Sequence, residues 1–210
     1  MNILFEIEKE LPPVTGSFQN VDMTIFKNEL AKWNGKLETD PTMYSTLKNY
    51  WDYVQFGNNW TPSETAWSSA FISYGLQNAE FPKRSAHFQY IQDIKNNNFP
   101  TWGAYSIPKT NSLQLNVGDV LIRPRSASDT STHGDVVYKI ENGLAYLVGG
   151  NVSNTGKIVG TLKVDPSGKL TEEIYNYIVI LKKKRNTNHL IPLLGVGGLL
   201  GVLFLLRGRK

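Results

Sequence analysis

The chain has 210 residues and contains no cysteine, which excludes disulfides, zinc–thiolate sites and cysteine nucleophiles. Its formal net charge is +4, from 22 Lys and Arg against 18 Asp and Glu, but residues 182–210 hold seven of the basic residues and no acid. Residues 1–181 therefore carry a net charge of −3, which excludes a basic nucleic-acid-binding body because the cations that neutralise phosphates are missing.

The first 60 residues are predicted to form a helical lead-in. Residues 1–14 contain three acids and no basic segment followed by an apolar run, so we expect no cleaved secretory signal. Apolar side chains at spacings of three and four indicate amphipathic helices over 21–33 and 43–54. Gly57 and the two asparagines after it break this pattern.

Two further helices are predicted before the middle of the chain. The first begins at 61–64, which match a capping box with proline at the first helical position, or else it begins nearer Trp67. The second covers residues 85–96. Residues 100–111 are predicted to form a loop.

After residue 115 the apolar period changes to that of β-strands. Five short runs rich in β-branched and aromatic residues are separated by Gly, Asn, Asp and Ser. They cover residues 118–124, 133–143, 144–152, 157–165 and 175–183. Asn142-Gly143 between the second and third run is a strong hairpin sequence. Helices followed by antiparallel strands predict an α+β domain over 1–181, with its core over 61–181.

The C-terminal end is predicted to anchor the chain in a membrane. Residues 190–206 form an uncharged run of 17, which as a helix is about 25 Å long and just spans a bilayer core of about 30 Å. We assign 182–189 as a basic juxtamembrane linker and 207–210 as a basic tail. The alternative is a buried C-terminal helix. Gly197 and Gly201 have the GxxxG spacing that favours contact between copies of the chain.

Ser68, His133 and Asn151 are candidate catalytic residues. A serine hydroxyl needs a neighbouring base, and the base needs a third group that orients its ring. Ser68 lies near a predicted helix start, where free N–H groups favour negative charge. His133 opens a predicted strand, and Asn151 follows a neighbouring one. We therefore expect these three residues to act as nucleophile, base and orienter.

Four short motifs follow one another along the chain: WSSAF (67–71), SAHFQY (85–90), HGDVV (133–137) and GGNV (149–152). They resemble those of papain-like peptidoglycan hydrolases of the NlpC and CHAP group. The resemblance is to an uncharacterised bacterial and phage branch of that clan and covers roughly residues 38–165. It implies helices packed on an antiparallel sheet, with Ser68 in the position of the nucleophile, His133 in that of the general base and Asn151 in that of the orienter. The clan has a cysteine where this chain has Ser68.

Other residues of these motifs are further candidates. His87 is either a structural histidine or a residue that lines the cleft. Asp135 shares the strand face of His133 and is a second candidate orienter. Ser69 is the reactive hydroxyl if the alignment moves by one residue. Trp67 belongs to a set of aromatic residues expected mainly in the core, of which one or two can stack on a sugar face.

The resemblance implies a membrane-anchored hydrolase that cleaves an amide bond of cell-wall peptidoglycan or of a related peptide. The alternative is a catalytically inactive papain-like module that binds peptidoglycan or a partner protein. Neither metal-ligand spacing nor a phosphate-binding glycine loop occurs, so we expect no metal and no cofactor. A body held in the cytoplasm by one C-terminal span would not reach a cell wall. The internal membrane of a phage virion, facing the wall during entry, resolves this conflict.

Overall fold

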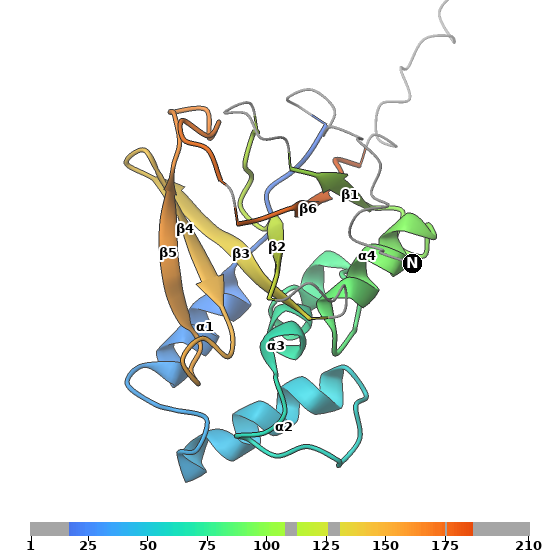
Figure 1. Cartoon of the computed structure of the whole chain (residues 1–210), viewed down its shortest axis with the longest axis vertical. Helices are drawn as coiled ribbons and strands as arrows, with labels where there is room; N and C mark the ends of the chain where they lie inside the picture. Colours follow the sequence, from blue (N-terminus) through green and yellow to red (C-terminus); the bar gives the residue numbers. More distant parts are fainter. Residues whose placement is uncertain (1–16, 108–112, 126–130, 175, 187–210) are drawn as a thin grey trace, which may run out of the picture.

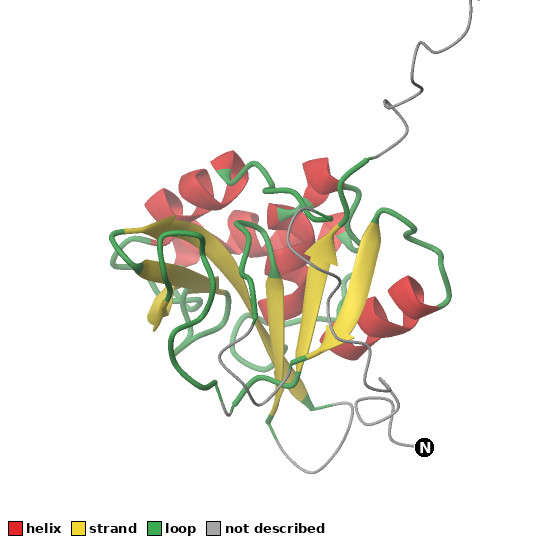
Figure 2. Ribbon diagram, turned by 90° about the horizontal axis from the view of Figure 1, so that it is seen from above, coloured by secondary structure: helices red, strands yellow, loops and turns green. Residues whose placement is uncertain are grey.

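The computed structural model describes residues 17–107, 113–125, 131–174 and 176–186. These residues form an α+β fold with four α-helices and a six-stranded antiparallel sheet, as the change in apolar period predicts. The helices gather on one side of the sheet (Figure 1 and Figure 2). They are α1 (Thr24–Trp33), α2 (Tyr44–Tyr53), α3 (Ser68–Gly75) and α4 (His87–Lys95), with short 3-10 helices η1 (Pro41–Met43) and η2 (Gln77–Ala79).

The strands follow one another in the sheet in the order β1-β6-β2-β3-β4-β5. The predicted hairpin between β3 and β4 is confirmed, since Asn142 and Gly143 have φ of 52° and 75°, the left-handed values that a tight primed turn requires. The strands are β1 (Trp102–Ser106), β2 (Val120–Pro124), β3 (Thr132–Glu141), β4 (Leu144–Gly149), β5 (Lys157–Lys163) and β6 (Val179–Lys183).

Alternate residues of the central strands face two separate apolar cores. In β3, Val136 belongs to the core shared with the helices, whereas Val137 belongs to the core on the other face. The second core is closed by Phe18 and by loop residues such as Leu115 and Leu170. Side chains on both faces of β3 are therefore buried, and neighbouring residues of this strand lie in different surroundings.

Buried aromatic residues hold the start of α3 in place. The Trp67 ring stacks on Trp33 with ring centroids 4.6 Å apart, and its indole N–H donates to Glu38 at 2.7 Å. The Trp33 indole N–H donates to the Tyr50 hydroxyl at 2.9 Å, and that hydroxyl donates to Glu29. Because the helical lead-in supplies all four partners, it fixes the position of the residue that precedes Ser68.

The structure decides between the two predicted starts of α3 and corrects one predicted loop. α3 begins at Ser68, which confirms the start near Trp67. The alternative start at 61–64 is wrong, because the Thr61 hydroxyl donates to Glu64 at 2.9 Å within a turn that does not continue into the helix. Residues 102–106 form β1, although this segment was predicted to be a loop. β1 is a five-residue edge strand that contains Gly103, and it is defined by its pairing with β6, about 80 residues later, which the local sequence does not specify.

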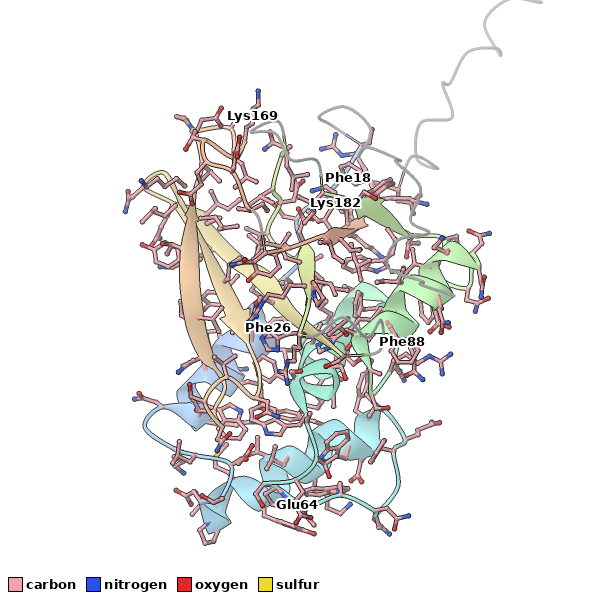
Figure 3. All side chains as sticks on the ribbon, viewed as in Figure 1. Phe18, Phe26, Glu64, Phe88, Lys169 and Lys182 are labelled. Carbon is pink, nitrogen blue, oxygen red and sulfur yellow. The ribbon has the colours of Figure 1, made fainter. Side chains whose placement is uncertain are left out.

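The predicted linker over 182–189 is wrong for its first two residues, because β6 runs to Lys183. The Lys182 side chain is 0% exposed and its ammonium forms an ion pair with Asp119. It also donates to the Gln114 carbonyl at 2.8 Å and lies 4.9 Å from the centre of the Phe18 ring, beside which Figure 3 shows it. Part of the basic charge assigned to the tail is therefore internal to the domain.

The predicted membrane span over 190–206 and its GxxxG pair lie outside the described residues. Within the described ranges, none of the helices is both long enough and apolar enough to span a bilayer.

We expect Lys182→Ala to lower the free energy of unfolding by about 3–5 kcal/mol, because it leaves the Asp119 carboxylate buried without its cation. The control is Lys48→Ala, which removes one partner of an ion pair in which Lys48 is 48% exposed, and exposed pairs contribute only about 0–1 kcal/mol. Urea unfolding of the two variants measures the difference, and equal losses would contradict the assignment of Lys182 to the core.

Candidate active site

Ser68 and His87 are the first residues of α3 and α4, and the two helix starts meet at one place. The Ser68 Oγ atom lies 3.4 Å from His87 Nε2. Both side chains are buried, with exposed fractions of 3% and 4%. The residues that precede them, Trp67 and Ala86, make no side-chain cap, so the first N–H groups of both helices lack the usual capping oxygen.

The His87 ring lies directly over the backbone of β3. A Cβ atom added to Gly134 would lie 2.8 Å from His87 Cδ2 and 3.2 Å from Nε2, so the ring occupies the space that any side chain at this position would take. A hydrogen bond to the Thr132 backbone favours the protonated ring. The partner is therefore the Thr132 carbonyl, because only an acceptor stabilises the cation.

Burial is the main reason that the pKa of His87 falls to about 3. Neighbouring His133 and Arg125 lower it further, and the Thr132 backbone opposes the shift only in part. His87 is therefore a neutral ring over most of the pH range. In the neutral tautomer with its proton on Nδ1, the Nε2 atom that faces Ser68 Oγ can accept the hydroxyl proton.

A second polar cluster lies on the opposite face of β3. His133 Nδ1 lies 2.8 Å from Arg125 Nη2, and His133 Nε2 lies 3.1 Å from Asp135 Oδ1. A guanidinium has only donors, so Nδ1 accepts and the proton is on Nε2, which donates to Asp135. The other oxygen of Asp135 accepts from the Tyr177 hydroxyl at 2.6 Å.

The structure changes the expected arrangement of Ser68, His133 and Asn151. The ring nitrogen within hydrogen-bond reach of Ser68 belongs to His87, because the alternation of β3 turns Gly134 and not His133 toward α3. The rings of His87 and His133 are nevertheless close, with centroids 6.1 Å apart. His87 is thus the histidine beside Ser68, and His133 lies next to His87.

The position expected for Asn151 beside His133 is taken by Asp135. Both ring nitrogens of His133 already have partners, and no described contact joins Asn151 to that ring. Asn151 lies after β4 with φ of 55°, a left-handed conformation that asparagine tolerates. Gly149 leaves the space that the Asp135 carboxylate occupies, since a Cβ atom on Gly149 would lie 2.4 Å from Asp135 Oδ1.

The remaining candidates differ in their access to the site. Ser69 lines the same pocket as Ser68, and its carbonyl accepts a hydrogen bond from Tyr90. Trp67 is fully buried in the aromatic cluster below α3 and is not available to a ligand. The pocket has a volume of about 180 Å³ and is lined by Ala66, Ser68, Ser69, Ser85, Ala86, His87, Arg125, Ser131 and Thr132.

Arg125 and Thr132 are pocket residues that the sequence did not single out. No motif contains Arg125, and its place in the pocket follows from the pairing of β2 with β3, which brings the end of one strand to the start of the other. Thr132 precedes the predicted strand by one residue. A search of the described residues finds no group of three or more His, Asp or Glu that could hold a metal ion.

Comparisons of the chain with protein-family models, with curated proteins and with solved structures gave no match.

We expect Gly134→Ala to lower the free energy of unfolding by about 1–3 kcal/mol and to push the His87 ring away from Ser68, because the new methyl group overlaps the ring. Gly160→Ala in β5 is the matched control, since an added Cβ there meets nothing within 4 Å. Urea unfolding and the histidine ring resonances in NMR measure both effects. A stable Gly134→Ala protein with unchanged His87 resonances would contradict the described packing.

Protonation of His87 should destabilise the fold in acid. The pKa of the ring is about 3 in the folded protein, against an ordinary value of 6.5 for histidine, so between these pH values the unfolded chain binds more protons. We therefore expect the free energy of unfolding to fall as the pH is lowered from about 6.5 toward 3. In His87→Gln this part of the pH dependence should be absent. Urea titrations of both proteins at several pH values measure the free energy of unfolding. If it falls equally with pH in the two proteins, the lowered pKa of His87 is contradicted.

Proposed function

We propose that the chain hydrolyses an amide bond in cell-wall peptides, with Ser68 as nucleophile and His87 as general base. The observation that carries this proposal is the 3.4 Å approach of Ser68 Oγ to His87 Nε2 inside a pocket at the start of α3. A nucleophile, a base within reach and a group that orients the base are the parts that acyl transfer to serine requires. In this proposal the Thr132 carbonyl takes the orienting role, because the Thr132 backbone favours the protonated His87 ring.

The reaction that these groups support has two halves. In the first, Ser68 Oγ attacks the amide carbon and its proton moves to His87 Nε2, which then gives the proton to the leaving amine as the C–N bond breaks. In the second, water attacks the acyl-serine, its proton passes to Nε2 and returns to Ser68 Oγ, and the carboxylic acid leaves. The uncapped N–H groups at the start of α3 are donors for the oxyanion in both halves.

His133 and Asp135 are positioning residues in this proposal. Asp135 accepts from His133 Nε2, which leaves Nδ1 to accept from Arg125 and so holds the guanidinium beside the pocket. Tyr177 and Arg123, the latter 3.9 Å from Asp135, complete the surroundings of this carboxylate. Neither His133 nor Asp135 lines the pocket.

The same proposal includes a membrane anchor at residues 190–206, supported by their uncharged, apolar sequence between two basic clusters. The lipid bilayer is then a partner of the chain, and Gly197 and Gly201 offer a contact between two copies. A location in the internal membrane of a phage virion would give the domain access to a cell wall.

A binding module that retains the pocket is the second candidate function, and one observation favours it. The pKa of His87 is lowered to about 3, so the imidazolium that forms when Ser68 loses its proton is costly. A substrate whose negative charge lies near the ring would reduce this cost. Without such a charge, the pocket is better suited to holding a peptide than to cleaving one.

Digestion of purified peptidoglycan by the detergent-solubilised full-length chain tests the first function. We expect Ser68→Ala and His87→Gln to lower the rate about 100-fold or more, because each removes a partner of the proton transfer. Ser73→Ala is the matched control on α3, because Ser73 is buried and donates to the Pro82 carbonyl at 2.9 Å but does not line the pocket. The control should remain active below its unfolding temperature.

Unchanged digestion by Ser68→Ala would remove Ser68 from the mechanism. An inactive wild-type chain that sediments with peptidoglycan, together with Ser68→Cys that gains hydrolysis, would establish the binding module instead.

A further inference from the structure

The pocket beside Ser68 has more positive charge than a neutral peptide needs. Arg125 lines it, and one of its nitrogens contacts His133. The charged groups that act on Arg125 are Arg123, which repels it, and Asp135, which attracts it. Two guanidinium groups therefore share one carboxylate among the described residues, and one positive charge lacks a counter-ion.

The starts of α3 and α4 add donors to the same pocket. Both helices are at least eight residues long, and their first residues, Ser68 and His87, line the pocket. Neither helix has a side-chain cap, so the first N–H groups at both starts lack the oxygen that usually caps them. Two helix starts that face one small volume favour a negatively charged ligand there.

A buried hydroxyl without a partner gives an independent sign of a missing ligand. Thr132 is 8% exposed and its Oγ1 atom is the buried side-chain oxygen that lacks a hydrogen-bond partner within the described part of the chain. Thr132 lines the pocket and shares the helix-facing side of β3 with Gly134. An unpaired buried hydroxyl costs free energy, so a ligand atom that pairs with it gains affinity.

We propose that the pocket binds a free carboxylate, so that the substrate is a peptide whose C-terminal carboxylate lies one residue beyond the scissile amide. This inference rests on the proposed function of Ser68. Arg125 and Thr132 Oγ1 bind the carboxylate, and the amide before it reaches Ser68. The activity is then that of a carboxypeptidase, which releases one C-terminal residue.

The charge and the size of the pocket support a carboxylate over other anions. An oxyanion exists only during the reaction and is satisfied by neutral N–H donors, whereas a guanidinium matches a permanent planar anion. One unpaired positive charge suits a singly charged group better than a phosphate, which carries more charge. A volume of about 180 Å³ admits one terminal residue and not an extended chain.

A carboxylate bound in the pocket would also raise the pKa of His87. Arg125 and His133 are among the groups that lower the pKa of this ring, and a carboxylate on Arg125 offsets the effect of the guanidinium. Binding of the correct substrate would therefore make His87 a stronger base at the moment when Ser68 must lose its proton.

Isothermal titration of the full-length Ser68→Ala protein tests this inference with two probes, acetyl-L-alanyl-D-alanine and its C-terminal carboxamide. We expect the acid to bind about 10-fold tighter or more, the range of a charge-assisted hydrogen bond. Adding Arg125→Gln should remove the preference, and Arg125→Lys should keep part of it. Lys48→Gln is the matched control, since it removes one positive charge at a residue that pairs with Asp52 on α2 and does not line the pocket, and it should keep the preference.

Thr132→Val provides a readout that a purely structural role would not give. It should weaken the acid several-fold while leaving the free energy of unfolding equal or higher, because the unpaired hydroxyl is replaced by a methyl group.

Equal affinity for acid and carboxamide, no measurable binding of either, or a preference that survives Arg125→Gln would overturn the inference. Tighter binding of inorganic phosphate than of acetate would overturn the assignment to a carboxylate. The proposed hydrolase can fail separately. An acid preference with no hydrolysis by wild type supports the carboxylate site and rejects the enzyme, whereas equally fast hydrolysis of acid and carboxamide supports the enzyme and rejects the carboxylate site.

Discussion

The packing of the His87 ring on the bare backbone of Gly134 is the contact on which the geometry of the pocket depends. It brings the start of α4 onto β3, so the ring lies against the β3 backbone and within reach of the Ser68 hydroxyl. The aromatic cluster around Trp67 fixes the start of α3 from below. Two helix starts and one strand thus meet at a single point, and a side chain on Gly134 would separate them.

The alternation of β3 divides the polar residues of its motif between two surroundings. Thr132 and Gly134 face the helices, whereas His133 and Asp135 face the opposite core with Tyr177. Arg125 connects the two sides because it contacts His133 and also lines the pocket. Charges buried on one face of the sheet can therefore influence the base on the other face, which is the physical reason that Arg125 and His133 contribute to the low pKa of His87.

Burial shifts the pKa of His87 and the pKa of Asp119 in opposite directions. His87 has no carboxylate beside it, so desolvation dominates and its pKa falls to about 3. Asp119 is also fully buried, and desolvation raises its pKa to about 6 although Lys182 lies against it. Burial therefore favours the neutral ring at His87, whereas Asp119 keeps its charge at neutral pH beside the Lys182 ammonium although its pKa is raised. A ligand that brings its own charge into the pocket changes that balance at His87.

The sequence by itself determined the α+β class, the amphipathic helices and the hairpin at Asn142-Gly143, because these depend on local periodicity and turn chemistry. It did not identify β1 or the burial of Lys182, which depend on pairing between segments about 80 and 60 residues apart. The contact between His87 and Ser68 likewise depends on the tertiary structure. Which of the two histidines approaches the Ser68 hydroxyl is set by which face of β3 packs on α3 and by the space that Gly134 leaves, and neither can be found from the SAHFQY motif that carries His87.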